Sequence, residues 1–324
     1  MSTCWLLCED KAGMINQARG LAEAAGLEPV LKRVTRRAPW KYLPPSLWFA
    51  ALKAAGPGSD ALSPPWPDVL IASGRYTVAL AQAIRRASGG RTFTVYIQDP
   101  KVNPARFDMV VVPEHDACRG ANVLTTRGAL HRVTPERLQA AAERFSPALA
   151  DLPHPRVAVL LGGNNRYYRL TPELAAELAR RLADLAHTRG AGFAITPSRR
   201  TDPQVVAALR TGLAGLPATI WDGTGENPYF GYLALADVIL VTADSVSMVS
   251  EACSTGKPVY VIELAGGGAK FRAFHAGLQA AGCTRPFAGA LDTWDYPPLD
   301  DTARVAGELR RRLAVHRQAL GVGE

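Results

Sequence analysis

The sequence predicts an α/β protein of two Rossmann-like domains whose parallel sheets face each other across a cleft. Two observations predict this fold class. Short segments that are apolar on both faces, as buried parallel strands are, alternate with helical segments. This pattern stops at a polar, proline-rich connector and then starts again. A chain of 324 residues is long enough for two such domains, each with a core of its own.

In the first half, the predicted strands end in polar turns. These strands are Cys4–Cys8, Val69–Ala72, Phe93–Ile97 and Met109–Val112. Helices follow the first two strands, over about Ile15–Ala25 and up to Arg86. Prolines 147, 153 and 155 mark the connector. We therefore expect an N-terminal domain over residues 1–150 and a C-terminal domain over 151–324.

The second half repeats the pattern with the predicted strands Arg156–Leu161, Gly192–Thr196, Val238–Thr242 and Val259–Glu263. The helix Thr171–Arg189 has the best defined ends, because Thr171 can cap it and Gly190 can end it. The last helix, about Thr302–Leu320, is amphipathic and rich in arginine. Its apolar stripe needs a partner to pack against.

Composition and charge limit the partners. The formal net charge of +8 favours an anionic partner, but no long basic run or aromatic–basic platform supports nucleic acid. The five cysteines are scattered, as in reduced cytoplasmic proteins. No signal peptide and no apolar run of about 20 residues is present. We expect a cytoplasmic protein that is soluble or at most peripheral on the inner membrane.

The most specific ligand signal lies between two strands of the second half, where a helix begins. Ser245 and Ser247 would lie at its N-terminus, where free N–H groups and the helix dipole attract phosphate. Glu251 lies further along the helix, where a carboxylate could accept hydrogen bonds from a ribose diol. The alternative interpretation is a serine-capped helix with a solvated glutamate.

Two neighbouring turns could contribute to the same site. Gly162 and Gly163 follow the first strand of this half and would let a ligand approach the backbone, although a plain tight turn fits as well. Arg199 and Arg200 follow the next strand, and guanidinium groups match diphosphate oxygens. A glycine run, 266–268, with Lys270 could form a second anion-binding nest.

The first half supplies the candidates for acid–base chemistry. Asp10 and Lys11 lie in the turn after the first strand, and His115 follows the fourth. Polar residues at strand ends often only cap helices, which is the alternative here. The chain has no nucleotide-binding G-x-G-x-x-G after a strand, no P-loop and no H-E-x-x-H zinc motif. No cofactor or metal is therefore expected.

The segment Arg36–Phe49 combines arginines and a lysine with Trp40 and Trp48. This composition is typical of an interfacial anchor on an anionic membrane. The alternative is a loop packed on its own domain with both tryptophans buried.

Several strings together resemble the bacterial relatives of the plant mitochondrial-fission Elm family. They are Cys8–Lys11 with Asn16-Gln17, Ile97–Pro100, Phe107-Asp108, Pro113–Asp116, Ser198–Thr201, Glu226–Tyr229 and Asp244–Glu251. The family resembles the two-domain GT-B glycosyltransferases, and bacterial members are often labelled nucleoside-diphosphate-sugar epimerases. The resemblance implies that Ser245, Ser247 and Glu251 bind the donor diphosphate and ribose, and that Asp10 and Lys11 face the acceptor. It also implies that the last helix packs back on the N-terminal domain.

These observations favour a metal-independent glycosyltransferase that binds a nucleotide sugar as its substrate in the cleft between the domains. One alternative is a nucleotide-sugar 2-epimerase of similar fold. Another, suggested by the fission role of the plant relatives, is a non-catalytic scaffold that recruits partners. The lack of a glycine-rich G-G-x-G-G-H first loop separates the chain from lipid-acceptor enzymes of this fold, so the acceptor, lipid-linked or soluble, stays open.

Overall fold

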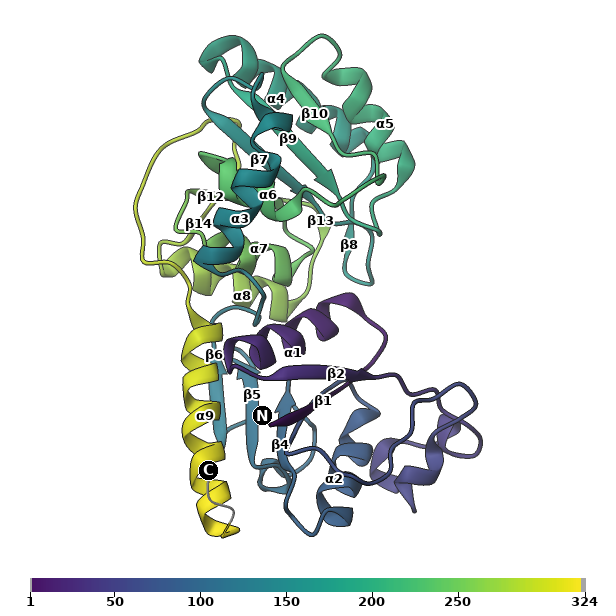
Figure 1. Ribbon diagram of the computed structural model, residues 1–324. Helices are drawn as coiled ribbons and strands as arrows, with labels where there is room; N and C mark the ends of the chain where they lie inside the picture. The colour runs from purple at the N-terminus through teal and green to yellow at the C-terminus, as the bar shows by residue number, and fades with distance from the viewer. Residues whose placement is uncertain (1, 322–324) are drawn as a thin grey trace. The chain divides into compact units, whose positions relative to one another are not determined.

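The computed structural model describes residues 2–321, which form two compact units (Figure 1). The N-terminal unit combines the chain up to Arg132 with the segment that begins at Asp300. The C-terminal unit is Val133–Leu299. Each unit contains a six-stranded sheet in which all strand pairs are parallel. The predicted α/β class with two Rossmann-like domains is confirmed.

In the N-terminal unit the strand order is β2-β1-β3-β4-β5-β6. The strands are β1 (Thr3–Cys8), β2 (Glu28–Lys32), β3 (Val69–Ser73), β4 (Phe93–Ile97), β5 (Met109–Pro113) and β6 (Val123–Thr126). Helices α1 (Ala12–Ala24) and α9 (Asp301–Ala319) cover one face, and α2 (Thr77–Ala87) covers the other. Alternate residues of each strand enter the two cores, because successive side chains point to opposite faces.

Helix α9 is remote in sequence from the unit to which it belongs. Its residues Val305, Leu309 and Leu313 are buried in one core with Leu21 of α1. Figure 1 shows the helix alongside the first sheet. The start of the helix is fixed as well, because Asp301 Oδ2 accepts hydrogen bonds from two backbone N–H groups, those of residues 127 (2.9 Å) and 128 (3.0 Å). The chain therefore returns to its first unit after completing the second.

In the C-terminal unit the strand order is β10-β9-β7-β11-β12-β14. The strands are β7 (Arg156–Leu161), β9 (Gly192–Pro197), β10 (Ala218–Ile220), β11 (Val238–Thr242), β12 (Val259–Ile262) and β14 (Thr284–Pro286). A separate antiparallel pair joins β8 (Tyr168–Arg169) to β13 (Ala265–Gly266). The helices are α3 (Pro135–Phe145), α4 (Pro172–Arg189), α5 (Pro203–Gly212), α6 (Tyr229–Leu235), α7 (Val246–Cys253) and α8 (Ala269–Ala280).

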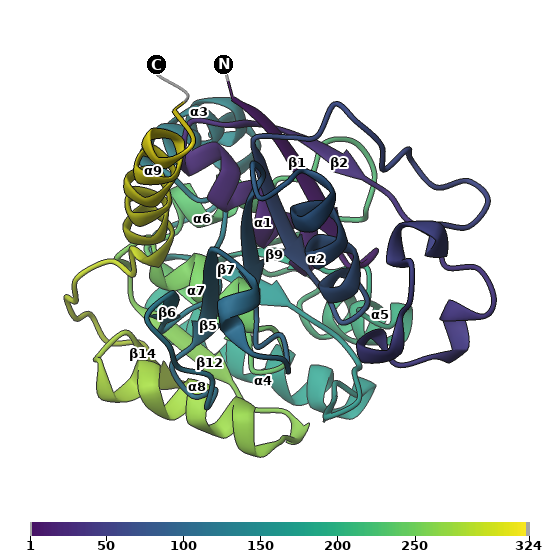
Figure 2. The same ribbon diagram turned by 90° about the horizontal axis from the view of Figure 1, so that it is seen from below.

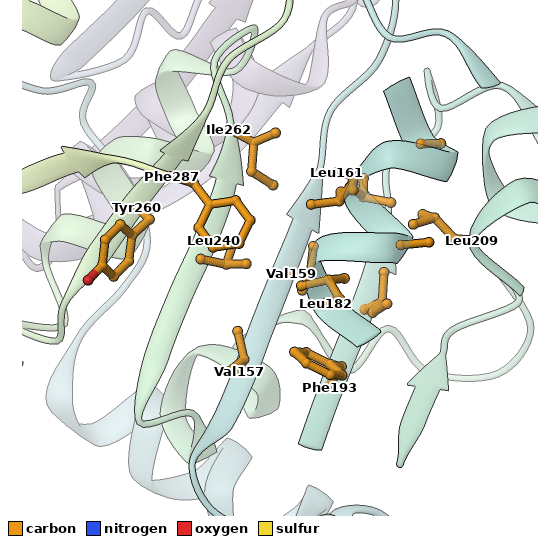
Figure 3. Close-up of a cluster of buried hydrophobic side chains, with 14 of the residues drawn as sticks. Val157, Val159, Leu161, Leu182, Phe193, Leu209, Leu240, Tyr260, Ile262 and Phe287 are labelled. Atoms are coloured by element: carbon orange, nitrogen blue, oxygen red, sulfur yellow. The ribbon is translucent and has the colours of Figure 1, made fainter. Parts of the chain in front are cut away.

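The core of this unit shows why β7 is apolar on both faces. Val157, Val159 and Leu161 point from β7 toward the face covered by α4 and α5 (Figure 3). Leu182 of α4 and Leu209 of α5 are fully buried in the same cluster. The intervening residues of β7 enter the opposite core, with α6, α7 and α8. A strand covered on both sides has no solvated face, so it reads as a continuous apolar run.

The division between the units falls at Arg132 instead of the expected residue 150. Residues 133–149 belong with the C-terminal unit because α3 packs on α6 and Leu149 is buried in the core with Leu233. The two helices approach closely at Gly231, where an added Cβ would lie 2.6 Å from Cβ of Phe145. The proline-rich connector therefore lies inside the C-terminal unit, ahead of its first strand.

Candidate functional site

Three adjacent strands of the C-terminal sheet, β9, β7 and β11, bring the predicted turns together at their carboxyl ends. Ligands of such sheets bind at this edge. The turns meet on Asp244, whose side chain is completely buried. Its carboxylate accepts hydrogen bonds from Thr242 Oγ1 (2.7 Å) and Gly163 N (3.0 Å), and Arg200 Nη2 lies 2.8 Å away. Asp244 therefore joins all three turns. We call its contacts with Thr242, Gly163 and Arg200 the Asp244 junction.

Gly162 and Gly163 are required by this junction. An added Cβ on Gly162 would lie 2.1 Å from Asp244 Oδ1, and one on Gly163 would lie 2.1 Å from the carbonyl oxygen of Arg200. Both contacts are far shorter than real Cβ atoms permit. Both glycines are buried, so the close approach that the structure describes is between turns of the protein itself.

The two predicted arginines have different surroundings. Arg200 is held by Asp244, and its backbone N–H donates to Ser198 Oγ at 3.2 Å. Arg199 is exposed, and its guanidinium has no hydrogen bond or ion pair with any residue among those described. Arg199 is thus the cation of this turn whose charge is not already neutralised by the protein.

Helix α7 begins beside the junction. Ser245 is its N-cap, and its Oγ accepts the backbone N–H of Met248 at 3.4 Å. The first-turn N–H groups of a helix have no intrahelical acceptors and carry the positive end of the dipole. Ser247 and Glu251 are four residues apart and so lie on the same face of the helix.

Glu251 is not a solvated residue. It is 7% exposed, and Tyr229 of α6 donates its hydroxyl to Glu251 Oε2 at 2.5 Å. Burial raises the pKa of Glu251 to about 7, and the hydrogen bond from Tyr229 opposes part of that rise. The alternative of a serine-capped helix with a solvated glutamate is right about the cap and wrong about the glutamate.

The glycine run 266–268 packs on the segment after β7. Gly266 is paired with Tyr168 in the β13–β8 pair, and Gly267 N donates to the carbonyl of Tyr167 at 2.8 Å. Because β7 and β12 flank β11 in the sheet, this pair connects the turns on either side of α7. Lys270 follows in α8.

His275 of α8 contacts the same junction. Its Nε2 lies 2.8 Å from the carbonyl oxygen of Ala243, so this nitrogen carries the proton. Burial lowers the pKa of His275, which keeps the ring neutral at pH 7. Its Nδ1 is buried without a hydrogen-bond partner among residues 2–321. No sequence motif marks this residue, because a single histidine inside a helix matches none.

In the N-terminal unit, Asp10 and Lys11 lie in the turn between β1 and α1, as predicted. Both are exposed. The ammonium of Lys11 lies 2.9 Å from Glu9 Oε2, so its charge is balanced within the turn. His115 is half-buried in the turn after β5. Three strand spacings separate β1 from β5, about 14 Å in the sheet, so these candidates do not form one cluster.

The turn after β4, between these candidates, is strained. Gln98 has a φ of 92° and Lys101 a φ of 57°, values that side-chain-bearing residues rarely adopt. Asp99, between them, accepts the backbone N–H of Lys101 at 2.9 Å. Strain of this kind concentrates at functional sites.

The segment Arg36–Phe49 departs from the expectation for its tryptophans. Trp40 is 7% exposed, and its Nε1 donates to the carbonyl of Phe49 at 2.8 Å. Trp48 packs against the core and donates to the carbonyl of Leu43 at 3.1 Å. The alternative of a loop packed on its own domain therefore describes the two tryptophans better, since Trp40 is buried, Trp48 is half-buried, and both indoles donate to backbone carbonyls of the same segment.

A family model described as mitochondrial fission ELM1 matches residues 12–313. The chain belongs to the mitochondrial fission ELM1 family. The Arabidopsis thaliana mitochondrial fission protein ELM1 is 38% identical over 275 residues, covering 76% of this chain and 64% of the Arabidopsis protein. The chain thus spans less than two thirds of that relative. An uncharacterized Rickettsia prowazekii protein is 27% identical over 297 residues, covering 78% of this chain and 81% of its own length.

The ELM1-family chain is similar in fold to three solved structures. UDP-GlcNAc 2-epimerase of Methanocaldococcus jannaschii has a TM-score of 0.57 at 11% identity and covers 96% of this chain and 99% of its own. MurG of Acinetobacter baumannii has 0.51 at 12%, covering 98% and 94%. Os79 of O. sativa, in complex with UDP, has 0.51 at 12%, covering 97% and 94%. At such identities the likeness shows the fold, which is GT-B-like.

The ELM1 family match includes the whole C-terminal junction and His115 but begins directly after Lys11. Two residues of the site have roles that sequence reasoning did not assign. Asp244 and Tyr229 lie within the strings Asp244–Glu251 and Glu226–Tyr229. An aspartate is common in turns and a tyrosine in cores, so their residue types alone indicate no function. Only the fold shows that one joins three turns and that the other holds Glu251.

None of the helices described is both long and apolar enough to cross a bilayer.

Proposed function

We propose that this ELM1-family chain is a GT-B-type glycosyltransferase that binds a nucleoside-diphosphate sugar at the carboxyl edge of its C-terminal sheet, without a metal ion. One observation carries the proposal. Ser247 and Glu251 share one face of α7, and the N-terminus of this helix follows the buried Asp244 junction. On this proposal, the groups that would bind a phosphate and a ribose lie one helical turn apart.

The diphosphate would lie against the first turn of α7, where unpaired N–H groups and the helix dipole favour negative charge. Ser247 Oγ could donate a further hydrogen bond. Arg199 is the cation best suited to the outer phosphate oxygens, because Asp244 does not neutralise it. Glu251 would accept hydrogen bonds from the ribose hydroxyls.

In the transfer step, an acceptor oxygen attacks the anomeric carbon of the sugar while the bond from that carbon to the phosphate oxygen breaks. The nucleoside diphosphate leaves with the bonding electron pair, and donors fixed in place stabilise its developing charge. A base takes the acceptor proton. We assign this role to Asp10 or His115, which lie in different turns of the N-terminal sheet, and Lys11 would steer an anionic acceptor.

The probe for this site follows from the solved structures of similar fold. Os79 is described in complex with UDP, and an epimerase of M. jannaschii in complex with UDP-GlcNAc and UDP. A thermal-shift panel of UDP, ADP, GDP, CDP and dTDP is therefore the first test. A ligand at 100 times its Kd should stabilise the unit that binds it by about 2.7 kcal/mol. Binding that survives in Glu251→Ala would contradict the ribose assignment.

Two other functions are distinguished from transfer by whether a nucleotide sugar binds and what products form from it. A 2-epimerase of similar fold would interconvert nucleotide sugars without an acceptor, and it needs acid and base groups on both sides of the sugar ring. A partner-recruiting scaffold is suggested by the name of the Arabidopsis relative. Sugar release without epimerisation favours transfer, a changed sugar favours epimerisation, and no binding of any nucleotide favours the scaffold.

We extend the proposal to an anionic membrane surface, which would place the protein peripherally on the inner membrane, near a lipid-linked acceptor. The proposed membrane-binding surface is the 36–53 segment, which includes the 3₁₀ turns η1 (Trp40–Tyr42) and η2 (Pro45–Leu47) and most of η3 (Ala51–Ala54). Figure 2 shows it looping out beside α2. Tyr42, Leu47 and Phe49 are 76%, 63% and 61% exposed and would enter the lipid in place of the two tryptophans.

The charge of the 36–53 segment complements an anionic surface. Arg36, Arg37, Lys41 and Lys53 are exposed, and none pairs with an acidic residue among those described. No Asp or Glu occurs between Glu28 and Asp60. Each such cation contributes about 1 kcal/mol near an anionic membrane.

Vesicle co-sedimentation with anionic and with neutral lipids tests the membrane surface. Leu47→Ser with Phe49→Ser should release the protein from anionic vesicles. The matched control is Val315→Ser, since Val315 is also apolar and 56% exposed but lies on α9. Equal binding to both lipids, or equal loss in the control, would contradict the membrane surface and leave a soluble acceptor.

A further inference from the structure

The string Glu226–Tyr229 precedes and opens α6, and each of its residues has a structural partner. Glu226 forms an ion pair with Arg144 of α3. Asn227 Oδ1 accepts the backbone N–H of Tyr229 at 3.0 Å, which fixes the first turn of the helix. Pro228 is buried, and its carbonyl accepts the N–H of residue 232 at 2.8 Å. The string therefore holds the side chain of Tyr229 in a defined position.

That position brings the Tyr229 hydroxyl to Glu251. The hydroxyl donates to Oε2 at 2.5 Å, across two helices that follow different strands of the sheet. Behind α7, the strands β11 and β12 present apolar side chains, Val241 and Val259, both fully buried. Within residues 2–321, the hydrogen bond to the Glu251 carboxylate thus comes from Tyr229, and the core behind α7 is apolar.

We propose that Tyr229 is a positioning residue for Glu251, holding one carboxylate oxygen so that nucleotide binding depends on the protonation state of this single carboxyl. The inference rests on the proposed nucleotide site. A carboxylate accepts hydroxyl hydrogen bonds about twice as strongly as a neutral group does. Ribose binding would therefore favour the ionised form of Glu251, and so does the Tyr229 hydroxyl.

Of the neighbouring titratable groups described below, Tyr229 is the one that contacts the Glu251 carboxyl and so affects its protonation. Burial raises the pKa of Glu251 to about 7, so both forms are populated at neutral pH, and the Tyr229 hydrogen bond works against the rise. From α8, His275 faces Ala243 and Asp244 at the start of α7. From α6, Tyr232 engages Thr219 and not Glu251. Burial and the charge of Glu251 raise the pKa of Tyr229 well above its usual value, so its hydroxyl stays a donor.

The test is calorimetric titration of the full chain with UDP-GlcNAc between pH 5.5 and 8.5. Both phosphates of this ligand are esterified and do not titrate in that range, so a change in affinity reports on the protein. Tyr229→Phe removes the hydroxyl and keeps the ring. Tyr232→Phe is the matched control, because it removes a hydroxyl from the same helix without touching Glu251.

In the wild type we expect affinity to fall as the pH drops below 7, with proton release on binding at pH 6. Tyr229→Phe should move the midpoint of this profile upward by about one to two pH units, the effect of a hydrogen bond to a charged acceptor. Tyr232→Phe should leave it in place. Glu251→Gln should weaken binding and abolish the pH dependence. It is the second variant to measure if Tyr229→Phe fails to fold.

The outcomes separate the two proposals. If the wild type binds neither UDP-GlcNAc nor ADP-glucose nor GDP-mannose, the nucleotide site itself is wrong. If it binds one of them and Tyr229→Phe leaves the midpoint unchanged, or Tyr232→Phe moves it equally, the positioning role of Tyr229 is wrong. A flat profile for both the wild type and Glu251→Gln would also overturn it.

Discussion

The guanidinium of Arg200 lies 2.8 Å from Oδ2 of Asp244, and the two side chains differ sharply in exposure, 44% for the arginine and 0% for the aspartate. The aspartate also accepts hydrogen bonds from Thr242 and Gly163. Water could solvate Arg200 if the pair were broken, but it could not reach Asp244. The two partners therefore contribute unequally to stability.

Asp244→Ala should destabilise the C-terminal unit by about 3 kcal/mol, because three donors lose their buried acceptor. Arg200→Ala should cost about 1 kcal/mol, since the other two hydrogen bonds to Asp244 persist. Urea unfolding measures both changes. Equal losses would show that the ion pair, and not the junction of the turns, dominates the contribution of Asp244.

Arg199 should behave in the opposite way. Its side chain is exposed and makes no ion pair with a described residue, so Arg199→Ala should change stability by no more than about 0.5 kcal/mol. The same change should weaken nucleoside-diphosphate binding about tenfold, the effect of losing one charge-assisted contact. Titration with UDP and with uridine gives the comparison, since only UDP should respond. An equal effect on uridine would exclude a phosphate contact.

The strands that the sequence predicted and those it missed differ in burial. Each predicted strand is a central one, such as β3 and β11, whose residues are buried throughout. The missed strands of the main sheets are β2, β6, β10 and β14, which form the four edges. Edge strands are partly exposed, as in β10, where no residue is fully buried. A search for runs apolar on both faces cannot detect them.

Candidate site residues were predictable where a residue type and a secondary-structure boundary coincide. Ser245 is the N-cap that its sequence position indicated, and Glu251 lies on the same helix. The partners of these residues were not predictable. Tyr229 is 22 positions from Glu251 and Arg200 is 44 from Asp244, and only the order of the strands brings them together.

The glycines of the first turn provide a third stability test. Gly162→Ala should destabilise the protein by several kcal/mol, because the new Cβ would overlap the buried carboxylate of Asp244. Gly277→Ala is the matched control. It lies inside α8 with nothing within 4 Å of the new Cβ, so the change should stabilise by about 0.5–1 kcal/mol through helix propensity. Thermal unfolding distinguishes the two, and a harmless Gly162→Ala would contradict the close packing of the turns.

Glu251 should make stability depend on pH in a window of its own. Its pKa is raised from 4.5 in the unfolded chain to about 7 in the folded one, so between these values the folded state binds more protons. Stability must then fall as pH rises through the window. The fall amounts to about 2 kcal/mol between pH 5.5 and 8, if the whole shift is realised.

Glu251→Gln removes this dependence while keeping the shape of the side chain. The variant should be more stable than the wild type at pH 8, and the difference should shrink toward pH 5.5. Glu177 and Glu308 do not mimic the effect, because ion pairs with arginines hold the pKa of each at about 2, below the window. Urea unfolding of both proteins at several pH values measures the difference directly. A constant difference across that range would mean that Glu251 is ionised throughout and that the apolar setting of α7 does not govern its proton.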